Sequence, residues 1–488
     1  MFAELPTPVR YFLLALGLVV VWCLLIWIDE ETPQGQRVAI HVKLKQGGEF
    51  APSTTIPNEV HLLFSTIPHD RSSPDPRARW WEIDVAAEDA EAELAALVAE
   101  PGVEVAYIEP LYTLPSAGAE AESCPITTPT YDHHQEYLGP APAGIGAADL
   151  WRRTQGQGVW FADIEGGWNA QHEDLPGARI THVAGKPISG WQPHGTAVLG
   201  EVVGQDNGKG VIGIAPEVER VFTSSIGGES VADAIEAAAD NLRAGDVLLI
   251  ELQATGPRGR YIAIEYWDDN YDAIRAAVQR GIIVVEAAGN GAEDLDHRAY
   301  KKKFDRWNRD SGAILVGAGA PPRPGYHDRE KLDFSNHGAR VDVQGWGRKV
   351  TTLDYGDLQR CSTESTHRHY TGEFSGTSSA SPIVAGAAIL MESWAKTHLG
   401  GPVSPVDLRR ALRDTGSPQT GDTRQHIGSR PDLAQALDAL VHSPRPADAG
   451  WRPAGYGAGR KFTRAALRSA PPPHWRPTIR ASAVRNKK

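Results

Sequence analysis

Hydrophobic positions divide the chain into segments of different periodicity. Residues 11–28 read YFLLALGLVVVWCLLIWI, an apolar run without a charge that is long enough to cross a bilayer as one helix. Arg10 precedes the run and acidic residues 29–31 follow it, so the positive-inside tendency leaves residues 1–10 in the cytoplasm. Because DEETPQG offers no small-x-small cleavage site, we expect an uncleaved signal anchor and a periplasmic or extracellular body.

Residues 32–114 have the pattern of a small α+β domain. RVAIHVKL and WWEIDV alternate as strands do, an Ala/Glu/Leu helix follows from about Glu88 to Ala99, and VEVAYIEPLY closes the unit. Residues 115–123 include PSAGAEAE, which has small and acidic residues without apolar periodicity. That composition predicts an exposed linker that is open to proteolysis.

From residue 124 to residue 442, short apolar runs alternate with Ala-rich helical stretches. The runs include GVWFAD, VLLIEL and GIIVV, and the helices include SVADAIEAAADNL and YDAIRAAVQRG. Short strands separated by longer helices predict an α/β domain with a mostly parallel central sheet that is covered on both faces. Working residues in such a sheet gather at the carboxyl ends of the strands.

Composition narrows the classes of partner. The chain of 488 residues is 41% hydrophobic and has a formal net charge of -12, so most of it can bury a core. Nucleic acid is disfavoured as the main partner because phosphate binding needs clustered Lys and Arg. Residues 443–488 are the exception, since they are rich in Pro, Gly and Arg without a sustained period, which predicts a disordered basic tail.

Cysteine usage leaves two alternatives. Cys23 lies in the apolar run, so Cys124 and Cys361 are the only pair outside it. They form one disulfide if the compartment is oxidising, or they remain two unpaired buried thiols.

Three polar residues have the types that nucleophilic catalysis by serine requires. Asp163 ends the apolar strand GVWFAD, His194 opens HGTAVLGEVVG, and Ser378 lies in GTSSASPIVAGAA at the start of a small-residue helix. A serine hydroxyl is a poor nucleophile without an adjacent base, and that base needs an orienting acid. The chain order Asp, His, Ser is one in which this constellation is known to occur.

Five segments, HGTAVLG, DNGKGVIGIAP, VVEAAGN, FSNHGARVDV and GTSSASPIVAGAA, resemble in order the motifs of subtilisin-like serine peptidases. The resemblance implies a subtilisin-like three-layer fold and a serine endopeptidase that hydrolyses protein or peptide substrates through an acyl-enzyme. It implies Asp163, His194 and Ser378 as the catalytic triad and Asn290 as the oxyanion-hole residue. No organic cofactor is required by this chemistry.

The same resemblance gives residues 32–114 a role as propeptide. VEVAYIEPLY looks like the end of a propeptide that assists folding and inhibits the enzyme until it is cleaved. We then expect self-cleavage between about Leu114 and Cys124, which would release the catalytic domain from the anchor. An ordinary accessory domain is the competing interpretation.

The chain departs from the family pattern beside the site. Relatives carry Asp-Ser/Thr-Gly, whereas this chain reads DIEGG from Asp163, so Glu165 is a second carboxylate that binds a basic substrate group or satisfies loop amides. Gln253, Ala254 and Thr255 stand where many relatives have a Ser-x-Gly strand that pairs with substrate backbone. These differences keep a rival open, namely a catalytically inactive binding protein with the same fold.

A structural calcium ion is a further expectation from the resemblance. Glu293, Asp294 and Asp296 could supply oxygen ligands for it. An ordinary acidic surface loop is the alternative, because no ligand spacing in this segment is diagnostic.

Overall fold

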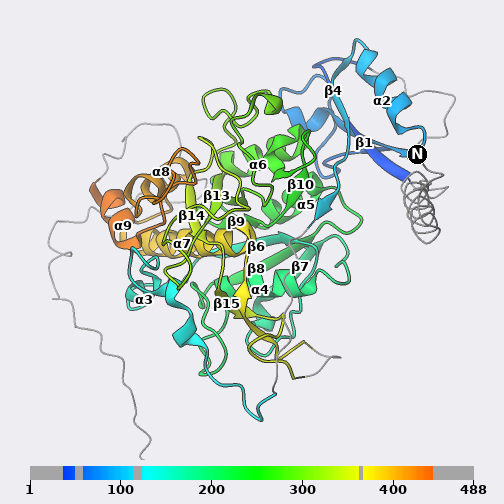
Figure 1. The fold of residues 1–488 in the computed structure, drawn as a ribbon. Helices are drawn as coiled ribbons and strands as arrows, with labels where there is room; N and C mark the ends of the chain where they lie inside the picture. Colours follow the sequence, from blue (N-terminus) through cyan, green and yellow to red (C-terminus); the bar gives the residue numbers. More distant parts are fainter. Residues whose placement is uncertain (1–36, 50–58, 114–123, 362–365, 443–488) are drawn as a thin grey trace, which may run out of the picture.

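The computed structural model describes residues 37–49, 59–113, 124–361 and 366–442 (Figure 1). The predicted anchor at residues 11–28, the linker at 115–123 and the tail at 443–488 lie outside these ranges. Among the residues described, no helix is both long and apolar enough to span a membrane.

The N-terminal unit is a four-stranded antiparallel sheet in the order β2-β3-β1-β4, with one helix, α2. Its apolar alternation puts Ile40 opposite Ile83 and Val42 opposite Trp81 on the two central strands. Ile40, Ile83 and Leu97 belong to a small core of this unit. The elements are β1 (Arg37–Leu44), β2 (Glu59–Leu62), β3 (Trp80–Ala86), α2 (Ala90–Ala99) and β4 (Val103–Ile108).

Seven parallel strands form the main sheet, in the order β14-β13-β12-β9-β6-β8-β7. Phe161 and Leu249 point into the core on one face, whereas Ala162 and Leu248 point into the core on the other. Both faces are buried, as the apolar runs predict. The strands are β6 (Trp160–Glu165), β7 (Ile180–Ala184), β8 (Arg220–Ser225), β9 (Val247–Ile250), β12 (Ile283–Ala287), β13 (Ile314–Gly319) and β14 (Val343–Trp346).

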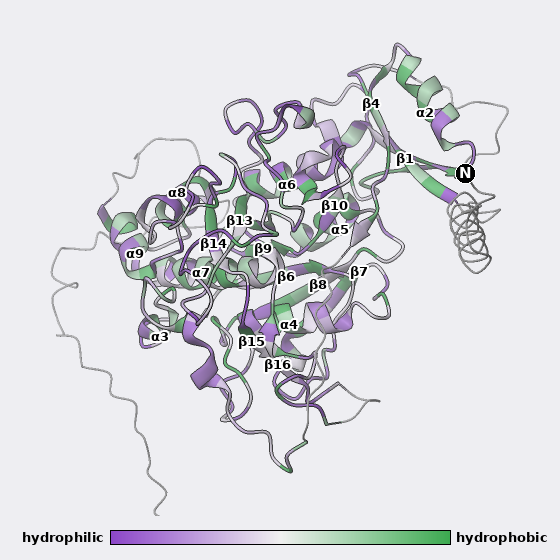
Figure 2. Cartoon of the chain, viewed as in Figure 1, coloured by the Kyte–Doolittle hydropathy of each residue, from purple (hydrophilic) through white to green (hydrophobic). Residues whose placement is uncertain are grey.

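Helices cover both faces of this sheet (Figure 1). One face carries α4 (Gln192–Val203) and α7 (Thr377–His398), and the other carries α5 (Val231–Asp240) and α6 (Asp268–Gln279). Figure 2 shows hydrophobic residues along the central strands and hydrophilic ones in many outer loops. Three further helices, α3 (Ala147–Leu150), α8 (Pro405–Thr415) and α9 (Leu433–His442), add residues to the core around α7.

Strand β6 continues past the end that its apolar run predicts. The prediction ended the strand at Asp163, but backbone pairing continues through Ile164, opposite Ile250 of β9, and Glu165, opposite Ser225 of β8. Pairing on both sides holds two buried carboxylates inside a strand, which apolar periodicity alone does not reveal. Asp163 is therefore inside β6, and Glu165 ends it.

A second, small sheet connects the N-terminal unit to the α/β domain. Strand β5 (Tyr112–Thr113) pairs antiparallel with β10 (Gln253–Thr255), which pairs with β11 (Tyr261–Ala263). A separate hairpin of β15 (Val350–Leu353) and β16 (Tyr370–Phe374) lies before α7 in the chain. The end of the N-terminal unit is thus held by backbone hydrogen bonds to the α/β domain.

Charge complementarity adds to that contact. Lys43 of β1 binds Asp272 of α6 at 2.9 Å, and Arg77 binds Glu236 of α5 at 2.8 Å. His41, which is buried, hydrogen-bonds Asp269 of α6 at 2.7 Å. Burial opposes the charged imidazole, but the charge and hydrogen bond of Asp269 outweigh it and hold the pKa of His41 well above its ordinary value. The N-terminal unit therefore places cations on carboxylates of α5 and α6.

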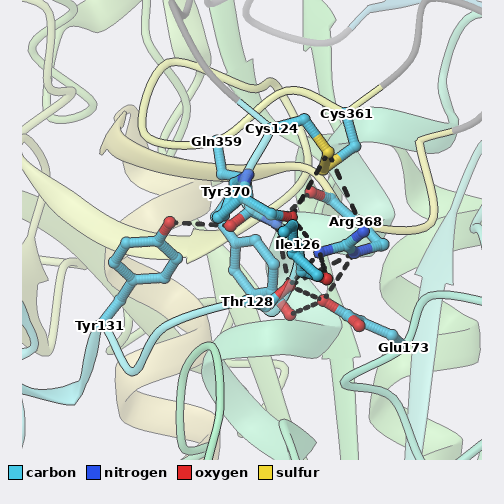
Figure 3. The surroundings of a disulfide bond; sticks show 10 residues. Cys124, Ile126, Thr128, Tyr131, Glu173, Gln359, Cys361, Arg368 and Tyr370 are labelled. Carbon is cyan, nitrogen blue, oxygen red and sulfur yellow. Dashed lines mark hydrogen bonds and ion pairs between the residues drawn. A yellow bond between two sulfur atoms is a disulfide. The ribbon is translucent and has the colours of Figure 1, made fainter.

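Cys124 and Cys361 are joined by a disulfide, with their Cα atoms 4.3 Å apart (Figure 3). Beside it, Arg368 donates to the carbonyl oxygen of Pro125 at 2.8 Å. The bond attaches the first residues after the linker to the segment that leads into β16.

The disulfide gives a simple mass prediction. Protein exported to an oxidising compartment and alkylated without reductant should show no label on Cys124 or Cys361, because both sulfurs are consumed in the bond. Intact-mass analysis before and after reduction measures this. Label on both cysteines before reduction would contradict the pairing.

Candidate active site

His194 lies at the start of α4, against the loop that leaves β6. The helix begins at Gln192, so the imidazole is in its first turn at the carboxyl edge of the sheet. A Cβ atom at Gly195 would lie 2.4 Å from the carbonyl oxygen of Gly167 and 2.8 Å from the ring of Trp168. Glycine at this position therefore allows α4 to pack directly on the β6 loop.

The carboxylate that meets His194 is that of Glu165. Oε1 of Glu165 hydrogen-bonds Nδ1 of His194, and its Oε2 accepts from the backbone N–H of Gly166 at 3.1 Å. Both side chains are almost fully buried, with exposed fractions of 0% for Glu165 and 3% for His194. Glu165 thus has the position and the partner that an orienting acid requires.

The structure corrects the sequence assignment of Asp163 as that acid. Asp163 shares a strand face with Glu165 but lies one step deeper in β6, and its Oδ2 accepts from Nε1 of Trp168 at 2.7 Å. The prediction was wrong because it ended the strand at Asp163. Glu165 is also too buried to bind a basic substrate group, although it does satisfy one loop amide.

The surroundings of Asp163 disfavour its charged form. Burial, followed by the neighbouring charge of Glu165, raises the pKa of Asp163 well above its ordinary value, and the hydrogen bond from Trp168 only partly opposes this. The Oδ1 atom of Asp163 is buried without a hydrogen-bond partner in the described part of the chain. The surroundings of Asp163 therefore favour its protonated form.

Ser378 is the second residue of α7, where unpaired backbone N–H groups and the positive end of the helix are concentrated. Gly376 precedes the helix with φ of 111°, a conformation that favours glycine. The hydroxyl of Ser379 donates to the carbonyl oxygen of Trp346 or of Gly376, at 3.0 and 3.1 Å. These contacts fix the turn that presents Ser378.

Asn290 follows β12 and is bound to the same turn. Its Oδ1 accepts from the backbone N–H of Thr377 at 2.8 Å and from the Thr377 hydroxyl at 3.1 Å. Its Nδ2 is buried and has no partner among the described residues. The side-chain amide is therefore held beside Ser378 with its donor free.

Gln253, Ala254 and Thr255 form β10, the stretch that stands where many relatives have a strand that pairs with substrate backbone. Thr113 lies opposite Gln253 and Tyr112 lies opposite Ala254, in antiparallel register. The Oε1 atom of Gln253 accepts from the backbone N–H of Asn290 at 2.7 Å. Gln253 thereby connects β10 to the backbone of Asn290.

Sequence reasoning missed Trp168, and it gave Glu165 the wrong role. One signal could have found Glu165: it is followed by Gly166 and Gly167, so the family's acid-x-Gly pattern fits better from Glu165 than from Asp163. The two-residue period of a strand also puts both acids on one face. Trp168 has no local signal, because its contact with Asp163 depends on the loop conformation.

The carboxylates of the acidic loop considered for calcium bind other groups of the protein. Oδ1 of Asp294 accepts from the N–H of Asp296 at 3.0 Å, and Oδ2 of Asp296 accepts from the N–H of Ala339 at 2.8 Å. Glu293 binds Arg258 at 2.9 Å. In the described ranges no three His, Cys, Asp or Glu side chains are grouped to hold a metal ion. Calcium binding stays a prediction.

Known proteins share this architecture. Residues 169–434 match the Subtilase family, Peptidase_S8. The Major intracellular serine protease of Bacillus subtilis (strain 168) is 26% identical over 56% of this chain and 84% of that protein. Subtilisin DY of Bacillus licheniformis is 31% identical over 54% of this chain and 85% of that protein.

A solved structure agrees in fold alone. Fervidolysin from Fervidobacterium pennivorans superposes with a TM-score of 0.54 at 18% identity, covering 86% of this chain and 63% of that one. The fold and site thus define a serine hydrolase with a large parallel sheet. The chain belongs to the subtilase family, and it is a subtilisin-like serine endopeptidase. Because the family match begins at residue 169, it does not include β6 or its two acids.

The contacts of His194 predict which acid the peptidase needs. Glu165→Gln should lower kcat by about 10⁴-fold, because an amide cannot hold the imidazole in the required tautomer or stabilise its charged form. Asp163→Asn should lower kcat by less than about 10-fold, since Asp163 does not bind His194 and an amide of equal size can still accept from Nε1 of Trp168. Steady-state hydrolysis of a chromogenic peptide measures both.

Each variant should first be matured with bead-bound wild-type enzyme that is then removed, because an impaired variant cannot be relied on to process itself. The reverse order of effects, with Asp163→Asn the more severe, would restore Asp163 as the acid.

Proposed function

We propose that the protein cleaves peptide bonds through an acyl-enzyme with Ser378, His194 and Glu165 as its triad. Ser378 attacks the scissile carbonyl carbon while Nε2 of His194 takes its proton and later delivers it to the leaving amine. Glu165 accepts from Nδ1 of His194 and stabilises the imidazolium that forms.

Negative charge on the tetrahedral intermediate is stabilised by Nδ2 of Asn290 and the backbone N–H of Ser378. Asn290 is suited to this because its Oδ1 is bound by Thr377, which leaves only the amide donor to face the reacting oxygen. The donor is oriented before substrate binds, so little reorganisation is needed during the reaction.

One observation carries the proposal: the buried polar atoms that have no partner in the described residues include two that the reaction uses. They are Nε2 of His194 and Nδ2 of Asn290. Buried polar atoms are almost always paired, so an unpaired one requires an explanation. A proton relay at Nε2 and an oxyanion donor at Nδ2 explain both, which an inactive binding protein does not.

The N-terminal unit acts as a propeptide and inhibitor in this proposal. Its last described strand, β5, lies on β10 as a substrate strand would, with Thr113 opposite Gln253. The contacts of His41, Lys43 and Arg77 with α5 and α6 hold the unit in place. The position of Thr113 opposite Gln253, whose side chain binds the backbone of Asn290, supports self-cleavage between about Leu114 and Cys124.

The N-terminal anchor gives the precursor its location. We infer a precursor held in the membrane by residues 11–28, with the peptidase domain periplasmic or extracellular, because a charge-free apolar run follows Arg10. A disulfide at Cys124 agrees with an oxidising compartment. Cleavage between about Leu114 and Cys124 would release the peptidase domain.

Ser378→Ala should abolish both casein hydrolysis and chain processing. The hydroxyl is the nucleophile for each reaction, and alanine in the same helix preserves the fold. Intact mass and N-terminal sequencing of the full chain measure processing, and a fluorophosphonate probe reports whether wild-type Ser378 is reactive. Ser379→Ala is a matched comparison in the same turn: it should weaken hydrolysis and processing without abolishing them, since this hydroxyl helps to hold the turn but is not the nucleophile.

Chain processing and probe labelling test different parts of the proposal. A Ser378→Ala chain processed like wild type would overturn self-cleavage. A wild type that the probe does not label, once its N-terminal unit has been removed, would favour the inactive binding protein.

A further inference from the structure

Glu251 is a buried carboxyl group that the reaction does not use directly. It follows β9, and its backbone N–H donates to the carbonyl oxygen of Ile164 at 3.2 Å, which places it beside Glu165 at the carboxyl edge of the sheet. It is 1% exposed, and its Oε2 has no partner among the described residues. Its Oε1 lies 2.5 Å from the hydroxyl of Ser381 in α7.

The contacts of the Ser381 hydroxyl indicate that the carboxyl group of Glu251 carries a proton. Its oxygen also lies 2.7 Å from the carbonyl oxygen of Thr377, one turn earlier in α7. A serine hydroxyl has one hydrogen, and a carbonyl oxygen can only accept. If Glu251 were ionised, Ser381 would face two acceptors with one hydrogen. A proton on Glu251 resolves this, because Glu251 then donates to Ser381 and Ser381 donates to Thr377.

That chain of hydrogen bonds ends on the turn that presents the nucleophile. Thr377 precedes Ser378 and also binds Asn290. Pro382 lies inside α7 and has no N–H, so the carbonyl oxygen of Ser378 lacks the hydrogen bond that a helix would normally provide. The first turn of α7 is therefore weakly held by the helix itself and depends on contacts such as that of Ser381.

The surroundings of Glu251 favour its neutral form. Glu165 and Asp163 face it from β6 and Glu201 faces it from α4, and these carboxyl groups oppose further negative charge. No Lys or Arg within the described ranges forms an ion pair with Glu251, Asp163 or Glu201. Burial first, then these carboxylates, raise the pKa of Glu251 well above its ordinary value, against the effect of the Ser381 hydrogen bond.

We propose that Glu251 is a positioning residue that carries a proton in the active enzyme and, through Ser381, holds the first turn of the nucleophile helix. Loss of that proton at high pH removes the donor and places a second charge beside Glu165. The ionisation of Glu251 thereby sets the alkaline limit of catalysis. This inference rests on the proposed catalytic role of Ser378.

The pH dependence of kcat in two variants of the full chain tests this. Glu251→Gln keeps a donor to Ser381 that cannot ionise, so kcat near neutral pH should stay close to wild type and the alkaline decline should move up by at least about one pH unit. Glu251→Met has similar length and no donor, so kcat should fall by about 3- to 10-fold at every pH. KM should change little, because Glu251 touches the helix and not the substrate.

Active sites are first counted with the fluorophosphonate probe, which separates this inference from the proposed function. If wild type is not labelled, the proposed function fails. If labelling is normal, two results would overturn the role of Glu251. One is a Glu251→Gln variant whose kcat declines at the same alkaline pH as wild type. The other is a Glu251→Gln variant whose kcat is as low as that of Glu251→Met.

Thermal unfolding supplies a readout that does not need activity. In a Ser378→Ala background the folded state binds the Glu251 proton more tightly than the unfolded chain does, so this contribution to stability is complete in acid. It is lost as pH rises from the ordinary carboxyl pKa toward the raised one. Adding Glu251→Gln should reduce the fall in unfolding temperature from acid to alkaline pH by about 2–4 °C. Asp163 and Glu201 titrate in both proteins, and loss of the Glu251 charge weakens the repulsion on them, which changes the fall in the same direction. Equal falls in the two proteins would overturn the proton on Glu251.

Discussion

The hydrogen bond between Nδ1 of His194 and the carboxylate of Glu165 is the contact on which the site depends. It exists because β6 extends to Glu165 and because Gly195 allows the first turn of α4 to rest on the loop after β6. With Nδ1 bound, Nε2 is left as the free atom of the ring. The longer side chain of Glu165 thus reaches His194 from the strand end, where the family pattern has Asp.

Buried acids of this domain are accommodated in two ways. Arg340 is fully buried and binds both Glu265, at 2.7 Å, and Asp342, at 2.8 Å, so a cation compensates these two carboxylates. On the face covered by α4 and α7, Asp163 and Glu251 have no such partner among the described residues, and burial favours their protonated forms.

Much of the fold was predictable from the sequence, and part of the site was not. The apolar runs predicted a parallel sheet buried on both faces, and the ordered motifs identified the family together with His194, Ser378 and Asn290 as candidates. The acid was assigned to Asp163 because apolar periodicity ends there, whereas strand pairing with β8 and β9 continues to Glu165. The contact of Ser381 with Glu251 joins residues 130 positions apart, so no local pattern contains it.

The proton on Nδ1 of His194 gives the most direct test of the Glu165 contact. In the fluorophosphonate adduct the imidazole is expected to be charged, and its Nδ1 proton should give a strongly downfield signal in one-dimensional proton NMR because it is shared with a buried carboxylate. We expect that signal in wild type and in Asp163→Asn, and its loss or marked upfield shift in Glu165→Gln. A downfield signal that survives Glu165→Gln and disappears in Asp163→Asn would contradict the pairing of His194 with Glu165.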